Sequence, residues 1–397
     1  MKLLYTLTAY PPSTGGAQLH QHMLAQNLSK NHSLQVVTHW DENRTDWLLG
    51  TTLLAPKADL DYVIDGINVH RVGIAYQEKV KILPYVLAYY PMMHRALPPI
   101  ADCLTQHLIP YAVQADLIHN VRIGREGLSY ASLQIARQRD IPFVFTPLHH
   151  PRWVGWRYQA YIQLYRMADR LIALTDTEKR LLIQFGVLED RITVTGMGPV
   201  LTAEAHPTAF LEKYSLDGPM LLFLGQHYPY KGYQAVLKAA PLVWERIPEA
   251  HFVFIGPAVG NSERVFASYE DRRIHRLGKV DLQEKTDALA ACSLLCVPST
   301  QESFGGVYTE AWSFGKPVIG CNIPAVSEVI SDGVDGYLVE QDPVQIAERI
   351  SYLLLNPGEA QVMGESGRQK VNARYTWSRL AELTEQAYRQ TMNGLVG

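Results

Sequence analysis

Short apolar runs recur along the first half of the chain, separated by segments whose apolar residues recur at helical spacing. Such runs, bounded by turn residues, are typical of strands buried in a parallel sheet. The dipeptide Asp65-Gly66 predicts a hairpin between residues 63–64 and 67–72. The other predicted strands of this half lie at residues 3–7, 34–38, 116–119, 143–146, 171–174 and 192–195.

The segments between these runs predict helices. Gly15-Gly16 opens one helix, which carries Leu24 and Leu28 on one side. A second is expected over residues 129–139. A third is capped by Thr175-Asp176-Thr177-Glu178 and runs to Phe185, with Gly186 just beyond as a stop signal.

The second half of the chain repeats the alternation. Its first helix places apolar residues from Tyr233 to Trp244 on one face. A terminal helix is predicted over residues 376–392, which can lie back across the first half. The predicted strands lie at residues 220–224, 251–255, 273–277, 294–297, 317–320 and 336–339.

Two halves that each alternate strand and helix predict an α/β chain of two Rossmann-like domains facing a cleft. A polar stretch with Ala and Pro, residues 201–208, is the expected linker. The predicted domains are residues 1–203 and 209–375. Residues 376–397 are expected to pack as a helix on the first domain.

Composition limits the classes of protein to consider. A chain of 397 residues is long enough for two cores, and 47% hydrophobic with 19% charged residues describes a folded chain. The net charge of −3 gives no general case for a nucleic-acid partner. The four cysteines form no C-x-x-C pair and are interpreted as small buried side chains in a reducing compartment. No metal site is expected.

Two further segments bear on localisation. The start of the chain has too short an apolar run for a signal peptide and is better interpreted as the first strand. The apolar region 80–93 is broken by Lys81, Pro84 and Pro91, so it does not predict a membrane span. The aromatic and basic region 75–157 is either a surface for an acceptor or a membrane, or, for 75–110, a pair of helices packed on the sheet. A cytoplasmic protein, in one alternative at the inner face of the membrane, is expected.

The segment from Val297 to Val318 organises the candidate chemistry. It predicts a strand, a loop, a helix over residues 307–314 and a second strand. Glu302 lies in the loop and Glu310 about two turns inside the helix, with Gly305 and Gly306 between them. The free N–H groups of a helix start donate hydrogen bonds to phosphate, and carboxylates accept hydrogen bonds from hydroxyls, so this arrangement suits a nucleotide sugar. The alternative is a buried β-α-β unit with two solvent-facing glutamates.

Three other loops that follow predicted strands contain residues typical of ligand binding. Gly15-Gly16 follows the first strand, although a tight turn for packing explains it about as well. His149 and His150 follow the strand at residues 143–146, at the end where α/β sheets bind ligands. Lys231-Gly232 follows the strand at 220–224 and supplies a cation.

These residues together resemble the retaining GT-B glycosyltransferases of family 4, the glycosyl transferases group 1, over nearly the whole chain. The most specific part is P-S-T-Q-E-S-F-G-G-V-Y-T-E-A-W-S-F-G-K-P-V, which is similar to the family's E-x7-E segment. The Gly15-Gly16 loop, the His149-His150 loop, Lys231-Gly232 and the Gly333–Gly336 turn follow in the family's order.

The resemblance implies a role for each matching residue. Glu302 would contact the donor sugar, and Glu310 would hold the ribose diol. Lys231 would neutralise the leaving diphosphate. The backbone at Phe304, Gly305 and Gly306 would line the sugar and phosphates, and Gly16 would allow close approach of the phosphates to the first domain. His149, or His150 in the alternative register, would lie near the reacting sugar.

One position departs from the family. Gln226 stands where the family usually has Arg, so the diphosphate would meet one cation fewer. Either another cation substitutes, with Arg122, Arg152 and Arg157 as candidates, or the donor binds more weakly.

The implied reaction is transfer of a hexose from a nucleoside-diphosphate sugar to an acceptor hydroxyl, with retention and front-face attack. A metal-independent reaction without a further cofactor is expected, with domain closure excluding water. The acceptor would be a glycan, a lipid or a small molecule on the side of residues 1–203, and residues 209–375 would bind the nucleotide sugar. Alternatives are a non-catalytic nucleotide-sugar-binding protein, a GT-B sugar-nucleotide epimerase, and a nicotinamide-dependent oxidoreductase, although Gly15-Gly16 does not extend to G-x-G-x-x-G.

Overall fold

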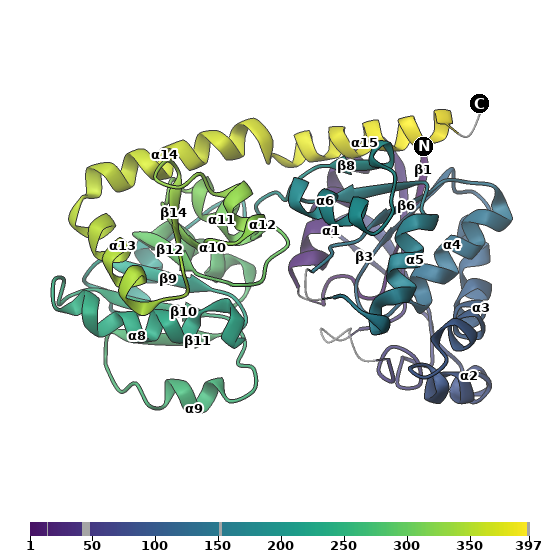
Figure 1. Cartoon of the computed structure of the whole chain (residues 1–397), viewed down its shortest axis with the longest axis horizontal. Helices are drawn as coiled ribbons and strands as arrows, with labels where there is room; N and C mark the ends of the chain where they lie inside the picture. Colours follow the sequence, from purple (N-terminus) through teal and green to yellow (C-terminus); the bar gives the residue numbers. More distant parts are fainter. Residues whose placement is uncertain (14, 42–47, 151–152, 395–397) are drawn as a thin grey trace. The chain divides into compact units, whose positions relative to one another are not determined.

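The computed structural model describes residues 1–13, 15–41, 48–150 and 153–394. It divides into two compact units: residues 1–196 with 377–397, and residues 197–376. Each unit is an α/β layer structure with helices on both faces of its sheet (Figure 1). Each is described by itself.

The sheet of the first unit has the strand order β3-β4-β2-β1-β5-β6-β7-β8. Every neighbouring pair is parallel except β3 and β4, which form the predicted hairpin, with φ of 48° at Asp65 and 78° at Gly66. The strands are β1 (Lys2–Leu7), β2 (Ser33–Thr38), β3 (Leu60–Ile64), β4 (Ile67–Arg71), β5 (Leu117–Val121), β6 (Phe143–Thr146), β7 (Arg170–Ala173) and β8 (Ile192–Val194). The helices are α1 (Gly16–Leu28), α2 (Tyr76–Ala88), α3 (Met93–Ala112), α4 (Gly127–Arg139), α5 (Gln159–Met167), α6 (Asp176–Gln184) and α15 (Trp377–Gly394), with short 3-10 helices η1 (Trp156–Tyr158) and η2 (Glu189–Arg191).

Alternate residues of these strands enter two different hydrophobic clusters. Leu3, Tyr5 and Leu7 pack with residues of α1 and α15, whereas Leu4 packs with residues of α3, α4 and α5. Burial on both faces explains why the strands are continuous apolar runs.

Strand β5 extends two residues beyond its predicted end, to Val121. The polar residue Asn120 interrupts the apolar run, so the sequence predicts that the strand ends before it. Its side-chain amide donates to the carbonyl and to the hydroxyl oxygen of Thr6 at 2.9 and 2.8 Å, so it is buried without an unpaired amide N–H.

The C-terminal helix α15 packs against α1. The hydroxyl of Tyr388 lies 2.7 Å from that of Tyr5 and 2.6 Å from Nδ1 of His119, and all three side chains are buried. These contacts join the chain's last helix to its first strand.

Residues 76–112 form a pair of helices, α2 and α3. Within the described residues α2 packs on α3 and α3 on α4, and α4 packs on β1, β5 and β6. Helix α3 also packs on the sheet, because the Tyr111 ring lies 4.7 Å from that of His70 on β4, and Leu104 and Leu108 share a hydrophobic cluster with Leu4 of β1. No helix of the described residues is both long and apolar enough to cross a membrane.

The second unit has a parallel sheet of order β11-β10-β9-β12-β13-β14. Its strands match the six predicted runs within one residue: β9 (Met220–Leu224), β10 (His251–Ile255), β11 (Ile274–Gly278), β12 (Leu294–Val297), β13 (Val318–Cys321) and β14 (Gly336–Val339). Its helices are α7 (Pro207–Lys213), α8 (Tyr233–Trp244), α9 (Ser262–Phe266), α10 (Leu282–Ala291), α11 (Gly306–Ser313), α12 (Pro324–Val329), α13 (Pro343–Leu355) and α14 (Pro357–Arg374), with the 3-10 turn η3 (Pro229–Lys231).

Candidate functional site

The β12–loop–α11 segment lies at the carboxyl edge of the second sheet, where the central strands β9 and β12 are neighbours. Gly305 precedes α11 with φ of +89°, a backbone conformation that a residue with a side chain rarely adopts. A Cβ on Gly306 would lie 2.8 Å from Sδ of Met197. Gly305 is thus required by the local backbone, whereas a side chain at Gly306 would displace the Met197 side chain.

Glu302 is paired with Lys231. Nζ of the lysine, at the end of η3, lies 2.5 Å from Oε1 of the carboxylate, and their side chains are 21% and 11% exposed. Phe304 is 2% exposed and packs edge-on to Tyr375. The structure therefore brings together two of the predicted residues that are 71 positions apart.

Backbone hydrogen bonds hold the two loops that carry this pair against each other. The N–H of Thr300 donates to the carbonyl of Tyr230 at 2.9 Å. The side-chain amide of Gln341 donates to the carbonyls of Tyr230 and Pro298 at 3.0 and 2.8 Å. A Cβ on Gly232 would lie 2.7 Å from the carbonyl oxygen of Pro298, so only glycine permits this approach. The positions of Lys231 and Glu302 are thus fixed by main-chain contacts.

Glu310 forms an ion pair with a different lysine, Lys285. Nζ of Lys285, on α10, lies 2.7 Å from Oε1 of Glu310 and 2.7 Å from the carbonyl of Val200. The N–H of Val200 also donates to Oε1, at 3.4 Å. The second oxygen, Oε2, is buried and has no hydrogen-bond partner among the described residues. A carboxylate oxygen of this kind costs free energy unless a ligand supplies a donor.

The loop after β9 places Gln226 in solvent, and the next residue, His227, is fully buried. The His227 ring packs beside those of Phe266, Tyr233 and Phe223. Burial, followed by the charge of Arg276, lowers the pKa of His227 to about 4, so this side chain is neutral near pH 7.

The remaining predicted residues lie in the first unit. Gly16 is exposed and begins α1. His149 follows β6 and is 2% exposed, and its Nδ1 lies 3.1 Å from the hydroxyl of Tyr165. His150 is half-buried, with its ring 5.2 Å from that of Trp153. Burial, then the charges of Arg122 and His150, lowers the pKa of His149 to about 3.

Two family models match the chain. That of the glycosyl transferase 4-like domain matches residues 15–198, and that of the glycosyl transferases group 1 matches residues 218–356. Together they cover well over half of the 397 residues. The chain belongs to this glycosyltransferase family.

Curated proteins of the family are similar to part of the chain. The D-inositol 3-phosphate glycosyltransferase of Kribbella flavida is 30% identical over 247 residues, which are 57% of this chain and 58% of that protein. The phosphatidyl-myo-inositol mannosyltransferase of Mycobacterium tuberculosis is 32% identical over 186 residues, 45% of this chain and 49% of that protein. The chain thus spans less than two thirds of the length of these curated relatives.

Solved structures share the fold over nearly the whole chain. HepE of Anabaena, crystallised with UDP and glucose, superposes with a TM-score of 0.73 at 17% identity, covering 97% of this chain and 98% of HepE. The sucrose-phosphate synthase of Thermosynechococcus elongatus gives a TM-score of 0.74 at 18% identity, covering 99% and 100%. The fold is that of the GT-B glycosyltransferases, as the sequence predicts.

Within this glycosyltransferase chain, sequence reasoning missed the lysine partner of one acidic residue. Glu302 and Glu310 are 9% and 7% exposed, so the alternative of two solvent-facing glutamates is wrong. Lys285 was not predicted. It lies 25 residues before Glu310, on another helix, and no local pattern connects the two.

The cations proposed to substitute at Gln226 have other contacts. Arg122 is 6% exposed and lies over the rings of Trp153 and Tyr161, at 3.9 and 3.8 Å from their centroids, so it is engaged inside the first unit. Arg157 is exposed and lies over the rings of Tyr90 and Trp156. Arg152 lies outside the described residues.

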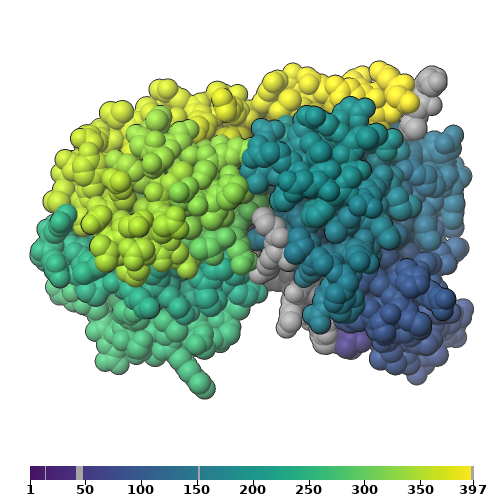
Figure 2. Space-filling model, in the orientation of Figure 1, coloured from purple at the N-terminus to yellow at the C-terminus, as the bar shows by residue number. Residues whose placement is uncertain are grey.

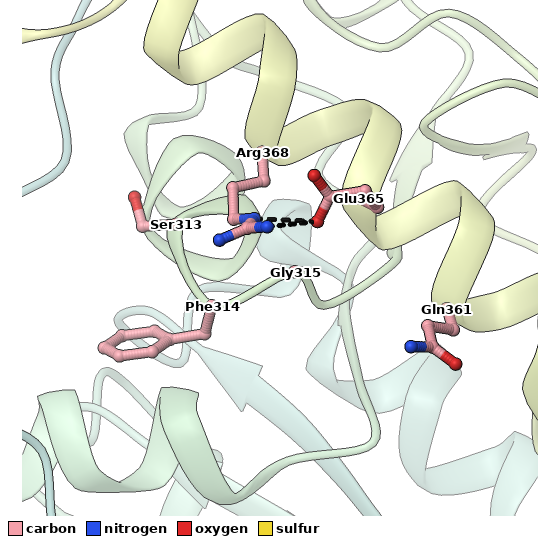
Figure 3. A pocket seen from close by; sticks show the side chains of 6 residues that line it. All are labelled: Ser313, Phe314, Gly315, Gln361, Glu365 and Arg368. Carbon is pink, nitrogen blue, oxygen red and sulfur yellow. Dashed lines mark hydrogen bonds and ion pairs between the residues drawn. The ribbon is translucent and has the colours of Figure 1, made fainter.

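A surface cavity of about 260 Å³ lies elsewhere in the second unit, between the end of α11 and α14. Figure 3 shows that the Arg368 guanidinium beside it is paired with Glu365. Both of these side chains are largely exposed, at 51% and 41%. None of the predicted site residues lines this cavity, which is lined by Ser313, Phe314, Gly315, Gln361, Glu365 and Arg368.

Gly305→Ala is expected to lower the free energy of unfolding by about 1–3 kcal/mol. The added Cβ would lie 2.3 Å from the ring of Tyr308, which is fully buried and donates its hydroxyl to the carbonyl of Val297 at 2.8 Å. Gly315→Ala is the matched control, because its φ is also positive, +64°, but its Cβ would meet nothing within 4 Å. Thermal midpoints measure both variants. Equal losses would show that the Tyr308 contact adds nothing to the backbone cost.

Proposed function

We propose that this protein transfers a hexose from a nucleoside-diphosphate sugar to an acceptor hydroxyl, with retention of anomeric configuration and without a metal ion. The observation that carries the proposal is the pair of buried carboxylate–lysine contacts, Glu302–Lys231 and Glu310–Lys285, at the carboxyl edge of one parallel sheet. Gly305 and Gly306 open the α11 helix between the two carboxylates.

The chemistry required by the reaction fits these groups. Glycosyl transfer develops negative charge on the leaving diphosphate, which an ammonium group and oriented N–H groups stabilise. Lys231 supplies the ammonium group, and the start of α11 supplies N–H groups and the positive end of a helix. Glu302 would then be released from Lys231 to accept hydrogen bonds from sugar hydroxyls, while Glu310 would hold the ribose.

A panel of UDP-, GDP- and ADP-sugars, followed first by thermal shift, tests the proposal, because a ligand that binds the native state raises the midpoint. UDP-sugars come first, since HepE was crystallised with UDP-glucose. The best donor is then incubated with inositol phosphates, monosaccharides and lipid extracts, with and without EDTA, and the anomeric coupling of the product is read by NMR. We expect an α-linked product from an α-linked donor, undiminished by EDTA.

Other outcomes of this experiment identify the alternatives. Donor binding without transfer or slow donor hydrolysis would indicate a nucleotide-sugar-binding protein. Isomerisation of the donor sugar without an acceptor would indicate an epimerase, and an inverted product would overturn the retaining mechanism.

We further propose that α2 and η1 contact an anionic membrane surface, where a lipid acceptor would be met. The α2 face carries Tyr76, Val80 and Leu87, which are 70%, 52% and 70% exposed, and the ring of Trp156 on η1 is 53% exposed. The blue-violet atoms of this part lie at the molecular surface in Figure 2.

The charges beside this apolar face favour an anionic partner. Lys81, Arg95 and Arg157 are exposed, whereas the acid of α2, Glu78, is half-buried and bonded to His107 at 2.8 Å. Co-sedimentation with vesicles tests the contact. We expect binding to vesicles containing phosphatidylglycerol, none to pure phosphatidylcholine, and loss of binding in Leu87→Glu. Equal binding of Leu87→Glu, or a concentration-dependent dimer that disappears in it, would overturn the proposal.

A further inference from the structure

The interior of the first unit behind His149 contains charged and polar groups that the proposed transfer does not use. Arg122, Tyr165 and Glu178 are 6%, 0% and 2% exposed. Tyr165 and Glu178 are hydrogen bonded to His149, and Arg122 is hydrogen bonded to Tyr165. Arg122 directly follows β5, Tyr165 lies on α5 and Glu178 lies on α6. Three elements thus converge on one histidine.

The directions of the hydrogen bonds around Tyr165 are fixed by chemistry. Nη1 of Arg122 lies 2.8 Å from the Tyr165 hydroxyl, and a guanidinium only donates, so the hydroxyl oxygen accepts there. The proton of that hydroxyl needs an acceptor of its own, because an unpaired buried donor costs about 1–3 kcal/mol. Within the described residues, the acceptor at the hydroxyl is Nδ1 of His149, at 3.1 Å.

A neutral imidazole carries one proton, so accepting at Nδ1 places it on Nε2. We propose that Arg122 and Tyr165 are positioning residues that hold His149 as the neutral tautomer protonated on Nε2, so that His149 offers the substrate a hydrogen-bond donor and not a base. The part of this proposal that concerns the substrate rests on the proposed function.

Glu178 holds the backbone at His149 in position. Its Oε1 accepts from the N–H of His149 at 2.6 Å, and its Oε2 accepts from the N–H of Leu174 at 2.8 Å, so one carboxyl group joins the segments that follow β6 and β7. Leu148, just before His149, has a φ of 45°, a strained value for a residue with a side chain. Strain of this kind persists where the surroundings over-determine a conformation, as they do here.

The environment also keeps the imidazole neutral. Arg122 and His150 are the groups whose charges oppose protonation, after burial itself, and His149 has a pKa of about 3 as a result. The other groups that face the ring are Tyr165, whose pKa burial raises to about 12, and the rings of Trp153 and Phe185. Glu178 contacts the His149 backbone through its carboxyl group, whose pKa burial raises to about 7. The imidazole is therefore neutral across the range from pH 5 to pH 8.

Nitrogen NMR of the histidine side chains in the full-length protein tests the tautomer directly. We expect His149, assigned by its loss in His149→Gln, to show an unprotonated Nδ1 and a protonated Nε2 from pH 5 to pH 8. In Tyr165→Phe this signature should change to a mixture of tautomers. Tyr130→Phe is the matched control, since it removes another hydroxyl in this unit, one that donates to the carbonyl of Ala160, and it should leave the signature unchanged.

A protonated Nδ1 in the native protein, or an imidazolium at pH 6, would overturn the inference whether or not the protein transfers sugar. The same holds if Tyr165→Phe leaves the signature unchanged while its thermal midpoint shows it to be folded. These readouts need no substrate, so their failure is distinct from failure of the proposed function.

Kinetics then test the donor role. The amide of Gln places an N–H near the position of Nε2, whereas the amide of Asn places it near Nδ1, and neither side chain is a base. We expect His149→Gln to retain about tenfold more kcat than His149→Asn, which is the value of one hydrogen bond. Equal loss in both variants, to the level of His149→Ala, would contradict the donor role. A kcat limb near pH 6 that disappears in His149→Gln would indicate a base.

Discussion

Lys231→Met is expected to reduce sugar transfer about a hundred- to a thousandfold while leaving the fold intact, since it removes a positive charge from the developing diphosphate. Glu302→Gln should reduce transfer similarly, through lost contacts to the donor sugar. Lys238→Met is the matched control, because Lys238 is exposed on α8, seven residues after Lys231. Initial rates with the best donor measure all three variants, and wild-type-like turnover in Lys231→Met or Glu302→Gln would refute the assigned role.

The Lys231–Glu302 ion pair also predicts how the single and double variants differ in their affinity for a nucleoside diphosphate. Lys231 and Glu302 neutralise each other before the donor binds, since their charged atoms lie 2.5 Å apart. Lys231→Met therefore leaves a buried carboxylate that repels a diphosphate. We expect the double variant Lys231→Met/Glu302→Gln to bind the free nucleoside diphosphate more tightly than Lys231→Met alone, by calorimetry. Strictly additive losses would show that the two side chains act independently of each other.

Glu310→Gln is expected to weaken nucleoside diphosphate binding about 10- to 100-fold, the value of a hydrogen bond to a charged group in a buried site. Its Oε2 is buried without a hydrogen-bond partner among the described residues, and a ribose hydroxyl would supply the missing donor. The loss should be large for UDP, or for whichever nucleotide binds best, and small for its 2′,3′-dideoxy analogue.

The analogue separates a ribose contact from a structural effect. If Glu310→Gln lost affinity equally for both nucleotides, the carboxylate would act through the protein and not through the diol. Lys285→Met provides a second comparison, because it removes the group that holds Oε1 at 2.7 Å but leaves the carboxylate in place. We expect an intermediate loss, confined to the nucleotide with an intact ribose.

Much of the fold could be predicted because its signals are local. The strands β9, β10 and β12 and the hairpin at Asp65-Gly66 follow from apolar runs and turn residues within a few positions of each other. The cap at Thr175 was likewise predicted, and its hydroxyl accepts from the N–H of Glu178 at 3.1 Å. Asn120 is polar but buried, because its amide is hydrogen bonded to the distant residue Thr6. The apolar pattern therefore predicted the wrong end for β5.

The candidate site was predicted in its residues more than in its contacts. Lys231 and Glu302 were each named, but as groups that act on different parts of the donor, whereas the structure pairs them directly. Arg122 was one of three candidate cations for the diphosphate, and it lies instead between aromatic rings and the Tyr165 hydroxyl.

The sequence by itself determined the alternation of strand and helix, the family resemblance, and the glycines and carboxylates at the ends of particular strands, because each depends on neighbours along the chain. Only the tertiary structure decided the strand order, the lysine partner of each carboxylate, and the group that accepts the Tyr165 proton. Those contacts join residues 16 to 71 positions apart, brought together where parallel strands end at one edge of a sheet. Their energies depend on distance and burial, which no local pattern of residues encodes.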